Sequence, residues 1–493
     1  MSARSLARHS QVILQYQKNT YHEEFLSSSA IWLHWLDNFS RNFPSSGMYF
    51  NKKLFCNLNW TAHGAKLFPL CYDESWVVDN GALHSACPPL TGILHKDNLA
   101  RLVLHLSKID IKQFDSSFVY RRHVNRVPLK AHPLTKDEEK HYSRSFDGLS
   151  TFVPVDIYDD NIQSRAGMLA CLNHVLRLCG AGDAEHPRAG LYSFLLLDVS
   201  TFWMLFRILY SFECFEPVRK SLYVFFGLWH PYSYANVAIW NCFRHTFIGP
   251  AFFHLFPSDM LLKRPSLTKC STFFTFMRQC YPTFRAFLLE NIDRLRSLTL
   301  QFDIDNVSLC LENKAINNNN PYRHRLVHLY NLHCLFDFCL PVVQDYISLL
   351  KHNDWWRFRR SSLKLLLLFI MIQNKGAQNY RAPMLFFMLK TMYWADHDQP
   401  IMSLLRANHT MFSEESGEIA LSRLASLQPT NMRESLRDTK EKWQGITHVA
   451  PCGPKPQPAR PRKSKFRFIG NCLLLLIRNP SVFIVACGYA NKY

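Results

Sequence analysis

The feature that most constrains this chain is an abrupt change of hydrophobic period at Asp198. Tyr192 to Leu197 is a short apolar run with the length and aromatic content of a strand buried on both faces. Apolar residues then recur at helical spacing from Phe202 to Leu209, with Ser200 or Thr201 as a candidate N-cap. A carboxylate between a buried strand and a helix lies where α/β sheets place ligands and metals. The simpler interpretation is that Asp198 only caps the helix.

Other predicted strands also end in side chains suited to metal or proton chemistry. A strand-like run from residue 30 ends in Asp37, and a buried-strand candidate at 222–229 is followed by His230. A third run leads into Asp159 and Asp160, which compete with Asp37 for the same position. The pattern further predicts a turn at 44–47, strands at 48–55 and 58–67, helices at 99–106, 168–178 (closed by Gly180), 235–256, 268–300, 325–350, 361–372 and 383–393, and a turn at 375–378.

Composition limits the class of protein. Of 493 residues, 48% are hydrophobic and 14% aromatic, which supplies a core and excludes a wholly disordered chain. The net charge of +19 favours phosphate backbones or anionic membrane surfaces as partners. The 15 cysteines form no Cys-x-x-Cys pair, and the N-terminus does not resemble a secretory signal, so we expect reduced thiols in a nuclear or cytoplasmic protein. The longest clean apolar run, 365–372, is far shorter than the ~20 residues that cross a bilayer.

A basic and aromatic cluster begins one of the predicted helices. Guanidinium groups beside aromatic rings suit nucleic acid, because the charges hold phosphates and the ring faces stack on bases. The alternative is a helix start whose tryptophans belong to the core and whose arginines are solvated. The candidate nucleic-acid-binding residues are Trp355, Trp356, Arg357, Arg359, Arg360 and Lys364.

A late acidic segment carries the remaining candidate chemistry. Ser413 is a natural N-cap, and Glu414 and Glu415 favour the positive end of the helix that follows. Glu418 lies one turn after Glu414, and Gly417 beside it permits close approach of another backbone or a ligand. The commoner meaning of such a run is an acidic helix start at the surface.

The order of these elements resembles the RNase H-like core of cut-and-paste DDE transposases. In that core an early strand ending in an acid is followed by a meander, a strand ending in Asp, one further strand, an all-helical insertion and a helix bearing Glu. More narrowly, the chain resembles transposase-derived eukaryotic proteins with Asp-Asn-Phe, Asp-x-x-Thr-Phe and Gly-x-x-His signatures. The matching residues, within about 30–430, are Asp37-Asn38-Phe39, Asp198 with Thr201-Phe202, Gly227 to His230 and Gly417-Glu418.

The resemblance implies an α/β fold, an RNase H-like mixed sheet with a large all-helical insertion. It also implies Mg²⁺-dependent cleavage or transfer of DNA strands. Asp37, Asp198 and Glu418 would hold two Mg²⁺ ions on the order of 4 Å apart, with His230 beside them as a polar organiser. DNA is the expected partner, in the nucleus or alternatively the cytoplasm, and a homo-oligomer is compatible with this interpretation.

Alternatives stay open at two of the acids and in the function. Asp159 or Asp160 competes with Asp37 as the first acid, and Glu414 or Glu415 with Glu418 as the third. Relatives with an acid after the glycine of Gly-x-x-His differ from this chain, which has Leu228 there. A host-adopted, non-catalytic protein that binds nucleic acid on the same scaffold is therefore the second hypothesis.

The predicted organisation follows from the same order. The divisions are an N-terminal arm (1–29), the first part of the sheet core (30–231, with an irregular insertion at about 72–150), the helical insertion (232–410), the C-terminal helices of the core (411–446), and a basic Pro-rich linker with an apolar tail (447–493), for which we expect disorder.

Overall fold

The structure is a computed structural model that describes most of the predicted core. The described residues are 30–49, 52–71, 86–109, 152–243, 335, 339–350, 354–372, 375–427 and 435–446. The predicted arm at 1–29, most of the segment 72–150, the predicted helix 268–300, the first part of the helix at 325–350 and the tail 447–493 lie outside them.

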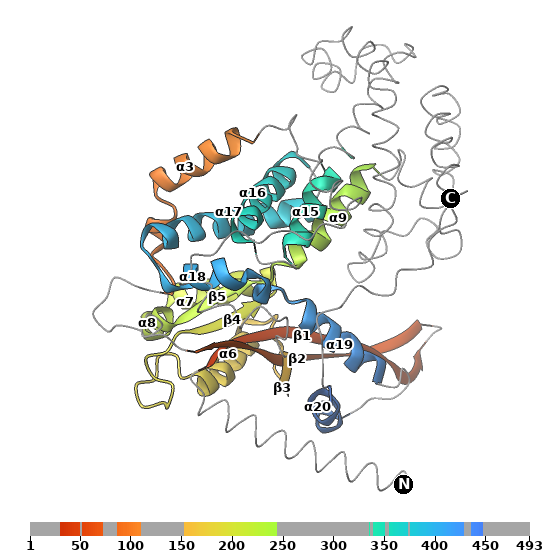
Figure 1. The fold of residues 1–493 in the computed structure, drawn as a ribbon. Coiled ribbons are helices and arrows are strands. Elements are labelled where there is room, and N and C mark those ends of the chain that lie inside the picture. Colours follow the sequence, from red (N-terminus) through yellow and green to blue (C-terminus); the bar gives the residue numbers. More distant parts are fainter. Residues whose placement is uncertain are drawn as a thin grey trace, which may run out of the picture.

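A five-stranded mixed sheet organises the described residues, in the order β3-β2-β1-β4-β5. Neighbouring strands are antiparallel in β1–β2 and β2–β3 and parallel in β1–β4 and β4–β5. The prediction of a mixed α/β fold is confirmed at this level (Figure 1). The strands are β1 (Ala30–Tyr49), β2 (Lys52–Cys71), β3 (Phe152–Tyr158), β4 (Ser193–Leu197) and β5 (Leu222–Phe226).

The hairpin of β1 and β2 differs from its prediction. No turn interrupts the chain at 44–47, because β1 continues to Tyr49 before β2 begins. A register shift between Pro44 and Met48 takes up the irregularity. Such a shift tolerates a proline, which has no N–H to donate to the ladder. The turn signals at 44–47 therefore mark an irregular strand and not its end.

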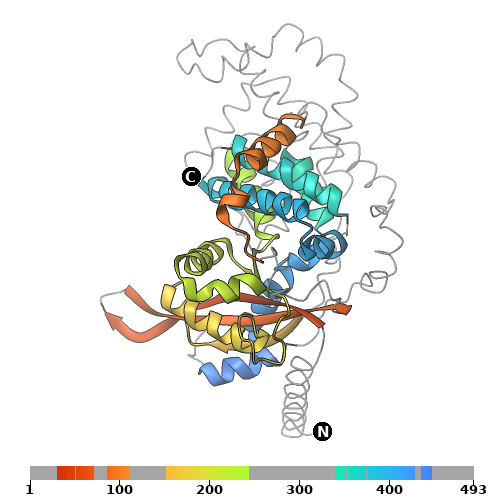
Figure 2. The ribbon, with the colours of Figure 1, turned by 90° about the vertical axis from the view of Figure 1, so that its left-hand side faces the viewer.

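Two groups of helices surround the sheet. Helices α9, α15, α16 and α17 lie together on the β5 side, whereas α6, α19 and α20 lie near β1, β2 and β3; the perpendicular view keeps the separation (Figures 1 and 2). Residues 375–378, predicted as a turn, are the first turn of α17. The helices are α2 (Leu90–Ile93), α3 (Lys96–Ser107), α6 (Arg165–Cys179), α7 (Val199–Ser211), α8 (Glu216–Ser221), α9 (His230–Phe243), α15 (Leu340–Leu349), α16 (Trp355–Met371), α17 (Lys375–Asp396), α18 (Pro400–Asn408), α19 (Glu415–Leu427) and α20 (Leu436–Gln444), with 3₁₀ turns η2 (Glu213–Phe215) and η6 (His409–Phe412).

The C-terminal end of α6 and the N-terminal end of α7 test two predictions about helix ends. Gly180 ends α6 in the left-handed conformation, with φ of 66°, as predicted. Asp198 occupies the N-cap position of α7, so the prediction of Ser200 or Thr201 as N-cap is wrong. The Asp198 side chain makes no capping hydrogen bond, and its carbonyl oxygen accepts from Thr201 Oγ1 at 2.8 Å. The carboxylate is thus not used as a helix cap.

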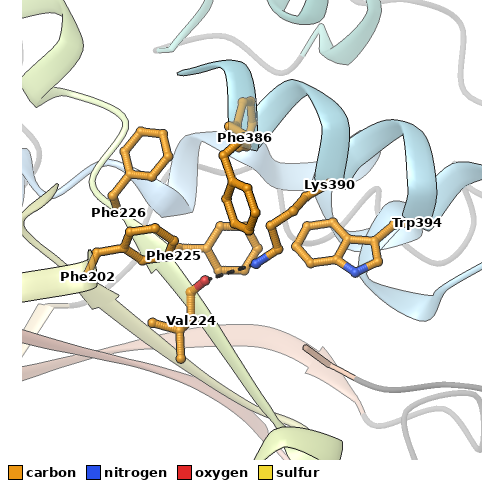
Figure 3. A pocket seen from close by; sticks show the side chains of 8 residues that line it. Phe202, Val224, Phe225, Phe226, Phe386, Lys390 and Trp394 are labelled. Atoms are coloured by element: carbon orange, nitrogen blue, oxygen red, sulfur yellow. Dashed lines mark hydrogen bonds between the residues drawn. The ribbon is translucent and has the colours of Figure 1, made fainter. Parts of the chain in front are cut away.

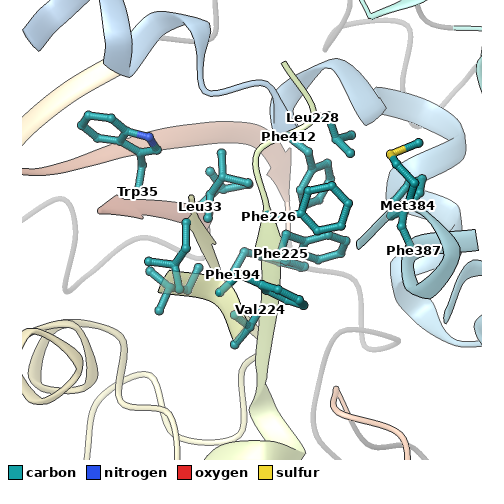
Figure 4. Packing of buried hydrophobic residues seen from close by; sticks show 14 of the residues in the cluster. Leu33, Trp35, Phe194, Val224, Phe225, Phe226, Leu228, Met384, Phe387 and Phe412 are labelled. Atoms are coloured by element: carbon teal, nitrogen blue, oxygen red, sulfur yellow. The ribbon is translucent and has the colours of Figure 1, made fainter. Parts of the chain in front are cut away.

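One hydrophobic core joins the sheet to the helices on the β5 side. The rings of Phe194 and Phe412 meet edge to face at 6.1 Å between centroids, and Phe226 meets Phe387 of α17 at 6.0 Å. Aromatic pairs of this kind add to the free energy gained by burying their area. Figure 4 shows this packing between β1, β4, β5 and α17, with Leu33, Trp35, Phe194, Val224, Phe225, Phe226, Leu228, Met384, Phe387 and Phe412 labelled.

A candidate site of carboxylates and histidine

The parallel pairing of β1 with β4 brings two acids side by side. Trp35 of β1 pairs with Leu196 of β4. Asp37 and Asp198, each two residues further on, therefore lie at the same level of the sheet. Asp37 is only 7% exposed. Burial raises the pKa of Asp37 well above its usual range, and the neighbouring Asp198 adds to the rise.

The third acid, Glu418, comes from the first turn of α19. A Cβ atom at Gly417 would lie 2.5 Å from Cε2 of Trp35, so this close approach of helix and strand requires glycine. The approach brings Glu418 to Asp37. Burial raises the pKa of Glu418, as does Asp198, although a hydrogen bond with Asp37 offsets part of the rise. The structure thus brings Asp37, Asp198 and Glu418 together.

His230, the first residue of α9, lies between these acids and a fourth one. Its Nε2 is 3.4 Å from Oδ1 of Asp198 and 3.6 Å from Oε1 of Glu418. Its Nδ1 forms an ion pair with Oε1 of Glu414. Burial alone lowers the pKa of His230, but Glu414 and Asp198 outweigh it, so that the pKa lies well above the usual value. His230 is therefore a cation that neutralises part of the carboxylate charge.

Glu414 holds the turn that precedes α9. Its side chain is 2% exposed. Its carboxylate accepts hydrogen bonds from the backbone N–H groups of Trp229 at 3.0 Å and His230 at 2.6 Å. Burial alone raises the pKa of Glu414, but His230 and these hydrogen bonds more than offset it, so that the pKa is lowered. Glu414, an alternative third acid, is thus the partner of His230, while Glu415 begins α19.

Asp159 and Asp160, the alternatives to Asp37, have other partners. Trp60 Nε1 donates to Oδ1 of Asp159 at 2.8 Å. Asp160 Oδ2 lies 3.7 Å from His174 Nε2. Both acids follow β3, which is separated from β1 by β2. In this geometry Asp37, and not Asp159 or Asp160, joins Asp198 and Glu418.

The donor set fits a hard divalent cation. Asp37, Asp198 and Glu418 offer carboxylate oxygens, which Mg²⁺ prefers as ligands. The charge of Asp198 raises the pKa of both Asp37 and Glu418, and a bound cation would remove that repulsion. Within the described ranges, no three His, Cys, Asp or Glu side chains are already arranged as a metal-coordinating group.

One buried cation next to this site was not predicted from the sequence. Lys66 of β2 is 3% exposed. Its Nζ donates to the carbonyl oxygen of Met411 at 3.3 Å and to that of Ser413. A lysine inside a predicted strand is the signal that could have found it, because a half-buried strand rarely takes a charge on its core face.

The candidate nucleic-acid-binding residues of α16 divide between core and surface. Trp355 is 2% exposed, so it cannot stack on a base without leaving the core. Trp356 is 43% exposed, and the guanidinium of Arg406 lies 5.7 Å from its ring centroid. Arg360 is exposed, whereas Arg357, Arg359 and Lys364 are half-buried.

Further cations from α3 and α18 join α16. Burial lowers the pKa of Arg359, and Arg101 and Arg406 lower it further, so both of these guanidinium groups lie near that of Arg359. Burial lowers the pKa of His105, and the neighbouring charges of Arg359, Lys108 and Arg101 lower it further. Arg101 forms an ion pair with Asp396. We call the four charged residues, Arg101, Lys108, Arg359 and Arg406, the cationic surface.

Comparisons with known proteins found no match. No family model, no curated protein and no solved structure matches the chain. Among the helices of the described residues, none has the length and hydropathy that a membrane span requires.

Proposed function

We propose that this chain is a transposase-derived DDE protein whose sheet is an RNase H-like core. The strand order β3-β2-β1-β4-β5 supports this proposal, with antiparallel pairing on one side of β1 and parallel pairing on the other. The observation that carries it is the meeting of Asp37, Asp198 and Glu418 from two parallel strands and a distant helix. Acids so far apart in the chain meet only through the tertiary structure.

The proposed activity is Mg²⁺-dependent cleavage or transfer of DNA strands. Asp37, Asp198 and Glu418 would hold the metal through their carboxylate oxygens. Two Mg²⁺ ions held there would activate the attacking water or 3′-hydroxyl and would stabilise the leaving oxygen. Glu414 holds His230 Nδ1, which directs Nε2 towards Asp198 and Glu418. His230 thereby orients the acids and can hold a proton at Nε2. A DNA substrate implies a nuclear location.

A single carboxylate tests the metal site in two ways. Asp198→Asn removes one ligand and one of the mutually repelling charges. We expect a higher melting temperature than wild type without metal, loss of the thermal shift that Mg²⁺ gives the wild type, and a fall of about 10³-fold or more in Mg²⁺-dependent DNA cleavage.

The matched control for this test is Asp160→Asn, which removes an acid outside the site. Its thermal shift with Mg²⁺ and its cleavage rate should match those of wild type. Equal cleavage by Asp198→Asn and wild type would reject the mechanism. A wild-type protein with neither a Mg²⁺-induced shift nor cleavage would reject the metal site.

The second candidate function is nucleic-acid binding without cleavage, and the cationic surface favours it. Like charges held close together repel, and a polyanion relieves that repulsion while releasing its own counterions. Trp356 adds an exposed ring beside Arg406. The proposed ligand is duplex DNA, bound through its phosphates.

Two charge-matched double variants test whether this surface binds DNA. Lys108→Gln with Arg406→Gln should weaken binding to a mixed-sequence duplex. It should also reduce the slope of log K against log salt concentration by about 2, roughly one for each lost phosphate contact. Arg165→Gln with Arg437→Gln removes the same charge from exposed positions on α6 and α20 and should change the slope far less. Equal effects of the two pairs, measured by fluorescence anisotropy at several salt concentrations, would contradict a localised surface.

A further inference from the structure

Lys66 stands out because its buried ammonium group donates to backbone carbonyl oxygens. Its Nζ donates to the carbonyl oxygens of Met411 and Ser413, at the junction of η6 and α19. Glu414 and Glu415, which follow at once, favour its charged form, whereas burial lowers its pKa to about 8. A buried ammonium costs free energy that an apolar side chain of the same length would not. The contact therefore needs a reason beyond filling space.

The register of β1 and β2 supplies that reason. Leu33 pairs with Lys66, Trp35 with Gly64, and Asp37 with Ala62, so these alternate pairs share one face of the sheet. The segment from Ser413 to Glu418, which includes the first turn of α19, meets this face at three successive points. The Ser413 carbonyl lies on Lys66, Gly417 packs on Trp35, and Glu418 reaches Asp37.

We propose that Lys66 is a positioning residue that fixes the start of α19 on β2 and so sets Glu418 opposite Asp37. This inference rests on the proposed metal site, since it concerns where the third acid stands. Gly417 allows the helix to come close, but glycine cannot fix its position along the strand. The two hydrogen bonds from Lys66 do so, because both acceptors belong to the backbone immediately before Glu414.

A second buried lysine gives a matched comparison. Lys390 of α17 is also 3% exposed, and burial likewise lowers its pKa to about 8. Its Nζ donates to the Val224 carbonyl at 3.4 Å and lies 4.6 Å from the ring centroid of Trp394. Figure 3 shows Lys390 among aromatic rings between α17 and β5. Lys390 thus ties α17 to the edge strand β5, and its hydrogen bond and cation–π partners in the described part of the chain lie on β5, α7 and α17.

The experiment compares Lys66→Met with Lys390→Met in the full chain. We expect Lys66→Met to weaken Mn²⁺ binding, measured by the paramagnetic resonance of free Mn²⁺, by about tenfold or more. It should also speed amide hydrogen exchange in α19 of the metal-free protein. Lys390→Met should leave Mn²⁺ affinity within about threefold of wild type, whatever it does to global stability.

The two readouts separate this inference from the proposed function. Unchanged Mn²⁺ affinity in Lys66→Met, in a wild type that binds Mn²⁺, would overturn the positioning role. If the wild type binds no Mn²⁺, the proposed metal site is rejected, and amide hydrogen exchange in α19 alone tests the role of Lys66. Faster exchange in Lys66→Met than in Lys390→Met, after correction for global stability, supports the role. Equal exchange in the two variants rejects it. Should Lys66→Met not fold, Lys66→Gln, with a shorter side chain that keeps a donor, takes its place under the same criteria.

Discussion

Replacing Glu414 by alanine is expected to lower the free energy of unfolding by about 3–5 kcal/mol, the range for breaking a buried ion pair from one side. Alanine would remove the acceptor of the Trp229 and His230 backbone N–H groups and of His230 Nδ1. It would also leave the His230 cation buried without its closest counter-charge. Chemical denaturation followed by circular dichroism measures the loss.

Two further variants of this segment control the Glu414 prediction. Glu414→Gln keeps the shape and one acceptor oxygen, so its cost should fall between those of alanine and wild type. Glu415→Ala changes the half-buried neighbouring acid and should cost about 1 kcal/mol or less. A loss in Glu414→Ala no larger than in Glu415→Ala would show that Glu414 does not hold the turn before α9.

Replacing Gly417 by alanine is expected to destabilise the protein by about 1–3 kcal/mol, although alanine is the better helix former. The new Cβ would meet the Trp35 indole. The indole cannot move aside, because Trp443 stacks on it at 6.4 Å between centroids and Phe152 meets it edge to face at 5.7 Å. Overpacking therefore outweighs the gain of about 0.5–1 kcal/mol in helix propensity. Thermal and chemical denaturation measure the difference.

A substitution on the exposed side of the same helix measures the contribution of helix propensity by itself. Ala425→Gly makes the reverse change where the side chain meets solvent, and it should cost about 0.5–1 kcal/mol. If Gly417→Ala stabilises the protein by a similar amount, α19 has room to shift, and glycine does not set its distance from β1. In that case the approach of Glu418 to Asp37 would need another cause.

Much of the fold could be predicted because its signals are local. The run before Asp198 and the helical period after it depend on neighbouring residues, and both elements appear as β4 and α7. Gly180 ends α6 for an equally local reason, its freedom to take positive φ. Signals at 44–47 and 375–378 were misleading, since β1 continues past the first segment and the second is the first turn of α17.

What the sequence determined by itself is the set of acids and the elements that bear them, because hydrophobic period and helix-end chemistry are written in adjacent residues. What only the tertiary structure decided is which residues these acids contact. Parallel pairing set Asp37 beside Asp198, a missing Cβ at Gly417 brought Glu418 to them, and burial made Glu414 the partner of His230 and Lys66 the anchor of α19. Contacts between residues hundreds of positions apart leave no local pattern, since they depend on how whole elements pack.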